Sequence, residues 1–355
     1  MKYIIDPSKM MIAKLMRFID PPLTRSYNII TNFIIVSFLY AFNKLHLIFM
    51  RIVPQSVRVW WQKFLQDVFI NILKAGPIPE HVSFIMDGNR RYAKSNNLPL
   101  KKGHEAGGFT LLTLVYICKK MGVKCVSAYA FSIENFNRSE EEVATLMALF
   151  NAKLEEFANR AQDFRDPLYG SKLRIVGDRS LLSEETKTKL KEVERLTKDG
   201  KDFTFYVCFP YTSRNDIQHT MYLNTKDYVE KKIELNDITV SKFSDKMYLD
   251  EFSKKCDILI RTSGHQRLSD YMLWQSHQNS TIEFVPTLWP DFTFTQMCLI
   301  FFRWSFFTTI QRYNNKSSLN YPESRLTSKI PFLNKRRYQS LESLPEPPVA
   351  VSVLG

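Results

Sequence analysis

The sequence lacks the short motifs that mark the common nucleotide- and metal-binding enzymes. It contains no GxxxxGK[ST] loop, no GxGxxG fingerprint and no HExxH pair. The stretch GHEAGG at 103–108 resembles a glycine loop, but its spacing matches none of these motifs. The sequence also has no Cys-x-x-Cys pair and no Asp-Asp pair. The familiar phosphate loops, zinc-peptidase sites and paired-aspartate metal sites are therefore excluded.

Glycine and cysteine are both scarce. The chain has 11 glycines against 27 phenylalanines, which excludes a collagen-like or low-complexity protein. Its five cysteines are odd in number and have no metal-ligand spacing, so we expect buried, reduced thiols in a protein that faces the cytosol. With 45% hydrophobic residues among 355, the chain is long and apolar enough for a sizeable core.

Positive charge is plentiful, with a formal net charge of +13. Such an excess suits nucleic acid, an anionic membrane surface or phosphorylated small molecules, and composition does not choose among them. Residues 1–75 hold ten Lys or Arg against three Asp or Glu, which is more than half of the excess. We interpret residues 1–75 as a basic, apolar, membrane-associating segment.

The apolar runs of this segment, 32–42 and 45–53, are interrupted by polar residues and fall short of the ~20 residues of a clean span. An interfacial helix, a marginal transmembrane helix and a helix packed on the protein itself all remain open. No small-residue cleavage site follows, which argues against a cleaved signal peptide. Residues 313–355 are rich in Asn, Ser, Pro and basic residues and are interpreted as a polar C-terminal arm with little structure of its own.

The middle of the chain alternates short apolar runs with helical patterns. Strands are predicted at 82–86, 124–131, 172–177, 203–209, 257–261 and 281–285, and helices at 104–121, 139–164, 182–198, 213–232 and 268–278. This rhythm predicts an α/β fold with a mostly parallel sheet flanked by helices, here as one domain over residues 76–312. Ligands of open parallel sheets bind beyond the carboxyl ends of the strands, so the residues after each strand are the candidates.

The first strand is followed by Asp87, Gly88, Asn89, Arg90 and Arg91. Asn89 is a good N-cap for a helix that begins near Arg90, and a helix N-terminus with two arginines suits a phosphate. One acid beside these bases fits a Mg²⁺ ion that bridges a carboxylate and a diphosphate. The alternative is a capped helix with solvated arginines.

Two further strand ends carry polar residues. Ser132, Asn135 and Arg138 follow the second strand, where Ser139 with three glutamates after it predicts a helix start. No neighbouring His makes Ser132 a triad nucleophile. After the strand at 257–261, we expect Arg261, Arg267 and Ser269 to converge on one anion through a turn at Gly264, with Ser269 able to cap the next helix.

Six stretches carry a resemblance to a known family: HVSFIMDGNRRYAK, GHEAG, YAFSIENFNRSEEEVATLM, RIVGD, RTSG-QRLSDYMLWQ and LWPDF. Together they resemble the cis-prenyltransferases over roughly residues 75–310. They resemble the eukaryotic dehydrodolichyl diphosphate synthase subunits more than the bacterial undecaprenyl diphosphate synthases, and the fungal members most.

The resemblance implies a single α/β domain with a hydrophobic product tunnel and a defined reaction. Isopentenyl diphosphate would be added repeatedly to farnesyl diphosphate with Mg²⁺ as cofactor. The product would be a long polyprenyl (dehydrodolichyl) diphosphate for dolichol synthesis and protein glycosylation. It also implies the cytosolic face of the endoplasmic reticulum membrane, with lipid droplets as a second location.

Site roles carry over by resemblance alone. Asp87 would hold Mg²⁺, and Ser132 and Asn135 would assist ionisation and proton loss. His104 matches a histidine beside the allylic diphosphate. The residues implied to bind substrate are Gly88, Asn89, Arg90, Arg91 and Arg138 for the allylic diphosphate, and Arg261, Arg267 and Ser269 for isopentenyl diphosphate.

The chain departs from the bacterial members in two places. Ser280 stands where they have a metal-binding glutamate, and Glu283, at an odd offset on a strand, is predicted to face away and not to be a ligand. No Arg-x-Gly occurs in the sequence, whereas self-sufficient members end with one. Both departures match a two-subunit arrangement in which a Nogo-B-receptor-type accessory subunit supplies the Arg-x-Gly, so we expect low activity without that partner.

Two alternative functions remain open at this stage, and two segments have more than one structural interpretation. A non-catalytic scaffold subunit of the same family is one, and a membrane- or nucleic-acid-binding module is another, although no nucleic-acid partner is expected. The segment 158–171 is either a longer helix that lengthens the tunnel or a surface loop. The apolar stretch 294–307 contains Arg303 and is predicted to be a core or subunit-interface helix rather than a membrane span.

Overall fold

The computed structural model describes residues 54–277 and 280–319. The apolar runs at 32–42 and 45–53 and most of the expected C-terminal arm lie outside these residues. Within the described part of the chain, no helix is both long and apolar enough to cross a membrane.

Six parallel strands form one sheet, and all six predicted strands are present within two residues of the expected bounds. They are β1 (His81–Ile85), β2 (Cys125–Tyr129), β3 (Ser171–Val176), β4 (Phe203–Cys208), β5 (Ile258–Arg261) and β6 (Thr281–Phe284). The strand order is β3-β4-β2-β1-β5-β6, and every neighbouring pair is parallel. The predicted α/β class with a parallel sheet is confirmed.

Nine α-helices and five short 3₁₀ turns occur in the described residues. The α-helices are α3 (Gln55–Lys74), α4 (Asn89–Ser95), α5 (Leu100–Met121), α6 (Glu140–Gln162), α7 (Glu184–Leu196), α8 (Ser213–Val229), α9 (Val240–Ser244), α10 (Leu273–Ser276) and α11 (Phe294–Leu319). The 3₁₀ turns are η1 (Ile133–Asn137), η2 (Arg179–Leu181), η3 (Leu235–Asp237), η4 (Asp250–Ser253) and η5 (Trp289–Asp291).

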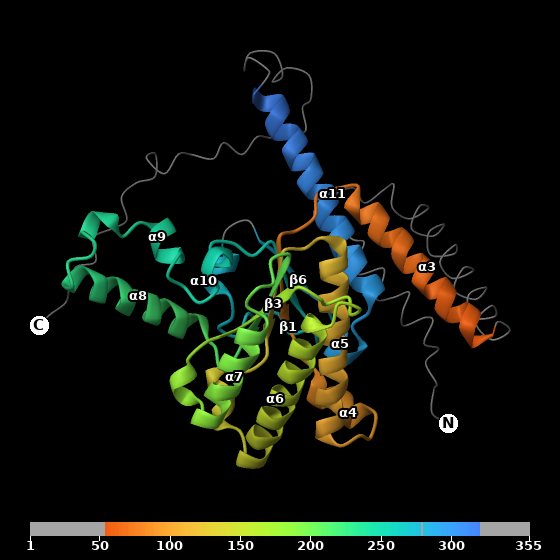
Figure 1. Cartoon of the computed structure of the whole chain (residues 1–355). Helices are drawn as coiled ribbons and strands as arrows, with labels where there is room; N and C mark the ends of the chain where they lie inside the picture. Colours follow the sequence, from red (N-terminus) through yellow and green to blue (C-terminus); the bar gives the residue numbers. More distant parts are fainter. Residues whose placement is uncertain (1–53, 278–279, 320–355) are drawn as a thin grey trace, which may run out of the picture. The chain divides into compact units, whose positions relative to one another are not determined.

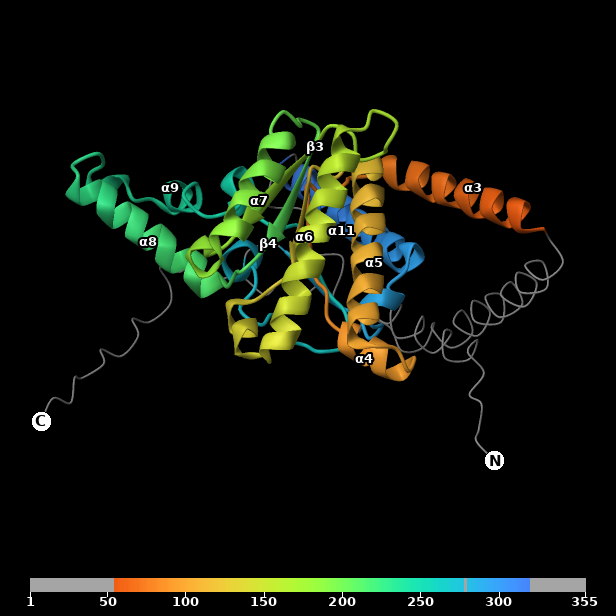
Figure 2. The same ribbon diagram turned by 60° about the horizontal axis from the view of Figure 1, so that its bottom comes forward.

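The sheet has a separate apolar core on each face. Side chains alternate along a strand, so Val82 and Phe84 of β1 belong to one core while Ile85 belongs to the other. The larger core is covered by helices, of which α5, α6 and α7 lie side by side (Figures 1 and 2). All five cysteines are buried, as predicted, and burial raises the pKa of each thiol, for Cys298 to about 12.

Helix α11 has one face in the core and another in solvent. Met297 and Phe301 are buried, whereas Phe302 and Phe306 are exposed. Its core role is therefore confirmed for one face. The helix ends at Leu319, beyond the boundary at 312 proposed for the catalytic domain.

Three local predictions were wrong. Of the helix predicted at 268–278, the described residues 268–277 contain only the four-residue helix α10, because Ser269, Asp270 and Met272 have positive φ and stop a longer helix. Asn89 is the first residue of α4 rather than its N-cap, a place taken by Gly88 with φ 115°. Ser269 does not cap α10 and instead contacts Arg261.

Two other local predictions were resolved by the structure. Ser139 caps α6 as expected, since its hydroxyl accepts a hydrogen bond from the Glu142 amide. In the segment 158–171, α6 ends at Gln162 and a loop with exposed Phe164 and Tyr169 follows. The surface-loop interpretation therefore applies to the second half of the segment 158–171.

Candidate active site

The strand order explains why three loops meet. Strand β1 lies between β2 and β5, and all three are parallel. Their carboxyl ends therefore share one edge of the sheet, and the loops that begin after Ile85, Tyr129 and Arg261 are neighbours. This edge carries most of the residues singled out from the sequence.

Asp87 lies at the centre of this edge. Its Oδ2 is 2.8 Å from a guanidinium nitrogen of Arg261, and its Oδ1 is 3.5 Å from one of Arg91. The backbone is fixed as well, because the Thr262 hydroxyl donates to the Asp87 carbonyl at 2.7 Å. An acid from the first loop is thus held by bases from α4 and β5.

The Asp87 carboxyl is ionised. Burial opposes its ionisation and is the largest single influence, but the hydrogen bond and charge of Arg261, the charge of Arg91 and a hydrogen bond from Ser263 together outweigh it and lower the pKa of Asp87. A half-buried carboxylate that stays charged at neutral pH is suited to a cation.

Arg261 joins this carboxylate to the third loop. It is nearly fully buried at 4% exposure, and its other terminal nitrogen donates to the Ser269 hydroxyl at 2.7 Å and to the Arg267 carbonyl at 2.5 Å. Its Nε is buried and has no partner among the described residues. The predicted convergence therefore holds for Arg261 and Ser269, whereas Arg267 contributes its backbone oxygen and has an exposed side chain.

A second basic group gathers around Glu142 of α6. Arg138 donates to Glu142 at 2.7 Å, and Nε of Arg90 lies 3.9 Å from the same oxygen. The pKa of His104 on α5 is lowered, first by burial and then by the positive charges of Arg138 and Arg90. The negative charge of Glu142 acts in the opposite direction but does not outweigh them. The His104 Nε2 atom is buried without a hydrogen-bond partner among the described residues.

Ser132 and Asn135 form a local turn after β2. The Ser132 amide donates to the Asn135 side-chain oxygen at 3.0 Å, and the Ser132 hydroxyl accepts from the Glu134 amide at 3.2 Å. Asn135 is thus held in a capping box at the start of η1. The two residues lie on the same sheet edge as Asp87, in the next loop.

Position 280 is remote from Asp87. Ser280 precedes β6, and its hydroxyl donates to the carbonyl of Cys256, which precedes β5. Both lie at the amino edge of the sheet, roughly 13 Å from the other edge at ~3.3 Å per strand residue. Glu283 is buried and paired with Arg303 of α11, consistent with the prediction that it is not a ligand.

Sequence reasoning missed several residues of the site. Thr262, Ser263 and His265 surround the Asp87–Arg91 pair: the Ser263 hydroxyl accepts from Arg91, and the His265 Nδ1 lies 3.3 Å from the same nitrogen. The sequence signal that could have revealed them is the pair of hydroxyl residues, Thr262 and Ser263, directly after the apolar run of β5. Glu142 was missed because its position looked like a first-turn helix acid and nothing more.

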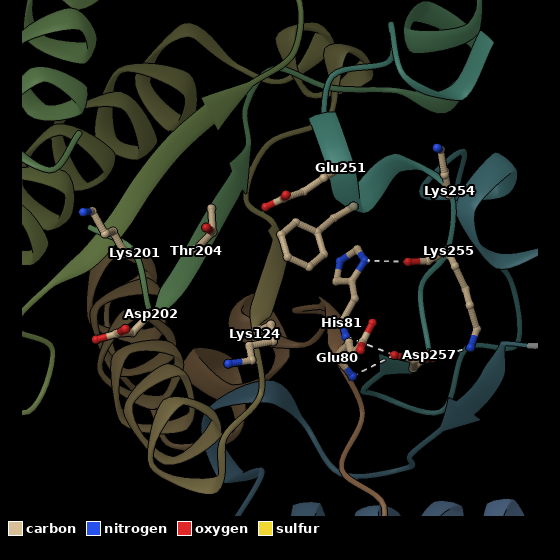
Figure 3. A pocket seen from close by; sticks show the side chains of 11 residues that line it. Glu80, His81, Lys124, Lys201, Asp202, Thr204, Glu251, Lys254, Lys255 and Asp257 are labelled. Atoms are coloured by element: carbon tan, nitrogen blue, oxygen red, sulfur yellow. Dashed lines mark hydrogen bonds and ion pairs between the residues drawn. The ribbon is translucent and has the colours of Figure 1, made fainter. Parts of the chain in front are cut away.

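A cavity among the described residues lies elsewhere. It has a volume of about 560 Å³ and is lined by residues at the amino ends of the strands, among them His81, Lys124 and Asp257 (Figure 3). Both ring nitrogens of His81 are already hydrogen-bonded, to the Lys255 carbonyl and the Ser127 hydroxyl. Four lysines face four acids there, so no net charge selects a ligand. Convergent charged side chains, and not cavity size, therefore identify the site.

The carboxyl edge of a parallel sheet thus carries Asp87 in contact with two arginines. A family profile described as "Putative undecaprenyl diphosphate synthase" matches residues 85–312. The chain belongs to this family, the cis-prenyltransferases, and is a transferase.

Individual members of the family are similar to this chain over most of its length. The chain is 58% identical over 308 residues to the dehydrodolichyl diphosphate synthase complex subunit SRT1 of Saccharomyces cerevisiae, covering 87% of this chain and 89% of that one. It is 36% identical to the human subunit DHDDS of the corresponding complex, over 73% of each chain. Among solved structures, lavandulyl diphosphate synthase from Lavandula x intermedia, in complex with dimethylallyl diphosphate, matches with a TM-score of 0.60 at 27% identity and covers 64% of this chain and 95% of its own.

Proposed function

We propose that this chain is the catalytic subunit of a dehydrodolichyl diphosphate synthase complex. It condenses isopentenyl diphosphate repeatedly onto farnesyl diphosphate and yields a long-chain polyprenyl diphosphate for dolichol synthesis. The single observation that carries the proposal is the buried Arg261, which joins the Asp87 carboxylate to the Ser269 hydroxyl across two strand-end loops.

The site residues divide into two sets, one for each diphosphate substrate. Arg90, Arg138 and His104, gathered at Glu142, lie where the allylic diphosphate would be held, at the N-terminal end of α4. Arg261, Arg267 and Ser269 would hold isopentenyl diphosphate. Negative charge develops on the allylic diphosphate as its carbon–oxygen bond breaks, and pre-placed guanidinium groups stabilise that charge. Ser132 and Asn135 would orient the reacting groups from the neighbouring loop.

Asp87 fits a magnesium site of the kind that is completed by substrate. Magnesium keeps several waters and is commonly held by one or two carboxylates plus substrate phosphate oxygens. The ionised Asp87 meets that need, and the described residues contain no cluster of three or more metal-ligating side chains that would form a self-contained site. When bound, the metal would neutralise charge on the leaving diphosphate.

A partner subunit and a membrane surface complete the proposal. The relatives in yeast and human are named as subunits of a complex, which supports a heteromer with an accessory subunit. Helix α3 exposes Trp60, Phe64 and Ile72, and these apolar side chains support a membrane-facing role for the N-terminal segment, at the endoplasmic reticulum or on lipid droplets.

The test is co-expression of the full chain with a candidate accessory subunit, followed by chromatography of radiolabelled polyprenyl products. We expect long-chain products with both subunits and a decrease of at least ~10²-fold in Asp87→Asn, because the carboxylate that would hold the metal is neutralised. Arg195→Gln, on the exposed surface of α7, is the matched control and should retain activity.

A scaffold subunit of the same family is the competing candidate. The convergence of Asp87, Arg261 and Ser269 disfavours it, because burying an acid among bases costs desolvation energy that a purely structural role does not require. An Asp87→Ala chain that supports full activity in the complex would establish the scaffold role instead.

A further inference from the structure

The loop that presents Ser269 has a strained backbone. Ser269, Asp270 and Met272 have φ angles of 52°, 58° and 50°, in the left-handed region that residues other than glycine rarely adopt. Such a conformation persists only where the surroundings fix it. The helix expected over 268–278 from local pattern is replaced by this loop, so long-range contacts must hold it.

The first turn of α8 supplies these contacts. The Ser213 amide donates to the Asp270 carbonyl at 2.7 Å, and the Ser213 hydroxyl accepts from the Leu273 amide at 2.8 Å. The Asp270 carboxylate accepts from the Arg214 amide at 3.1 Å and from Nε of Arg214 at 2.7 Å. A carboxylate at a helix N-terminus is also favoured by the helix dipole.

Arg214 reaches a second loop as well. Its terminal nitrogen donates to Glu134 at 3.1 Å, in the η1 turn that contains Asn135. The Arg214 side chain is largely exposed, at 73%, whereas the Asp270 side chain is 11% exposed. The contact with Asp270 is therefore the better shielded of the two, and the contact with Glu134 is weakened more by water and salt.

We propose that Arg214 is a positioning residue for isopentenyl diphosphate, which acts by fastening the left-handed loop Ser269–Met272 to α8 and so holding the Ser269 hydroxyl against Arg261. This inference deepens the proposed function and rests on it. Arg214 does not touch the diphosphate group itself. The planar guanidinium matters because Nε and the terminal nitrogen point at two different loops, which an ammonium group cannot reproduce.

A matched surface pair gives the control. Arg195 and Glu192 on α7 form an exposed two-point contact at 2.8 and 2.9 Å, remote in sequence from any strand-end loop of the site. Arg195→Gln removes the same charge and a similar ion pair as Arg214→Gln. Any effect common to both variants is then a general surface-charge effect.

The first measurement is binding of isopentenyl diphosphate with Mg²⁺ by calorimetry to the full chain assembled with its accessory subunit, without an allylic primer. We expect Arg214→Gln to weaken binding about 3- to 10-fold, Arg214→Lys to recover part of the loss, and Arg195→Gln to bind as the parent does. Asp270→Asn should weaken binding to a similar extent, and the double variant no more than either single one. Unchanged affinity in Arg214→Gln, or losses that add in the double variant, would overturn the proposal.

The second measurement separates positioning from loss of stability. Hydrogen exchange of the 268–273 amides should quicken in Arg214→Gln at an unchanged melting temperature. In the assembled complex, the KM for isopentenyl diphosphate should rise more than that for farnesyl diphosphate. Equal changes in both KM values would indicate a merely structural role. If the complex of the parent chain with its accessory subunit binds no isopentenyl diphosphate, the proposed function is wrong. Exchange in Arg214→Gln that is as slow as in the parent would overturn the loop-fastening role on its own.

Discussion

Gly107→Ala is expected to displace the side chain of Asn89, which precedes Arg90 and Arg91. A methyl group at Gly107 would lie 2.3 Å from Oδ1 of Asn89 and 3.0 Å from Cδ1 of Trp289. Trp289 is fully buried and donates its indole N–H to the Gly107 carbonyl at 2.8 Å, so it cannot withdraw. The side chain of Asn89, the first residue of α4, must move instead.

Gly108→Ala is the matched control, because it is the next residue of the same helix. A methyl group there would meet only the flexible end of Lys153, with Cε at 3.3 Å. Both substitutions gain about 1 kcal/mol from helix propensity. Overpacking at Gly107 costs about 1–3 kcal/mol, so we expect the two variants to differ in stability by about that amount.

Thermal unfolding and turnover in the assembled complex test this reasoning. For a domain of this size, 1 kcal/mol corresponds to roughly 2–4 °C, so Gly107→Ala should melt roughly 2–12 °C below Gly108→Ala. Its affinity for farnesyl diphosphate should also fall, because Asn89 is itself one of the residues assigned to the allylic diphosphate. Two variants with equal melting temperatures and equal turnover would refute the close approach of α4 to α5.

Three further outcomes are expected. Burial lowers the pKa of His81 to about 4 in the folded protein, so the unfolded chain takes up a proton at higher pH than the folded one does. The free energy of unfolding should therefore fall as pH drops from about 6.5 to 4, by up to about 3 kcal/mol. Denaturant titrations should show a smaller decrease of this free energy over the same pH range in His81→Gln. Arg261→Lys should weaken isopentenyl diphosphate binding ~10- to 100-fold in calorimetry, because one ammonium cannot contact Asp87 and Ser269 at once, and undiminished binding would contradict the central role of Arg261. Glu283→Gln should lower the melting temperature through loss of the Arg303 pair yet leave the Mg²⁺ concentration for half-maximal turnover unchanged; an increased requirement would make Glu283 a ligand after all.

The sequence by itself determined the strands, most of the helices and the loops that hold the site. Apolar runs of five to eight residues between helical patterns are local signals, and they placed β1 to β6 within two residues. Because the strands are parallel, residues directly after them had to share one edge, so Asp87, Ser132 and Arg261 were found without any knowledge of contacts.

Only the tertiary structure decided which atoms meet. Asp87 and Arg261 are 174 positions apart, and no local pattern encodes their contact. The role of Glu142 between Arg90 and Arg138, and the use of the Arg267 carbonyl rather than its side chain, depend on packing between elements. The loop at 269–272 makes the reason clearest: its local pattern favours a helix, and contacts with α8, more than 50 residues earlier, impose a left-handed backbone instead.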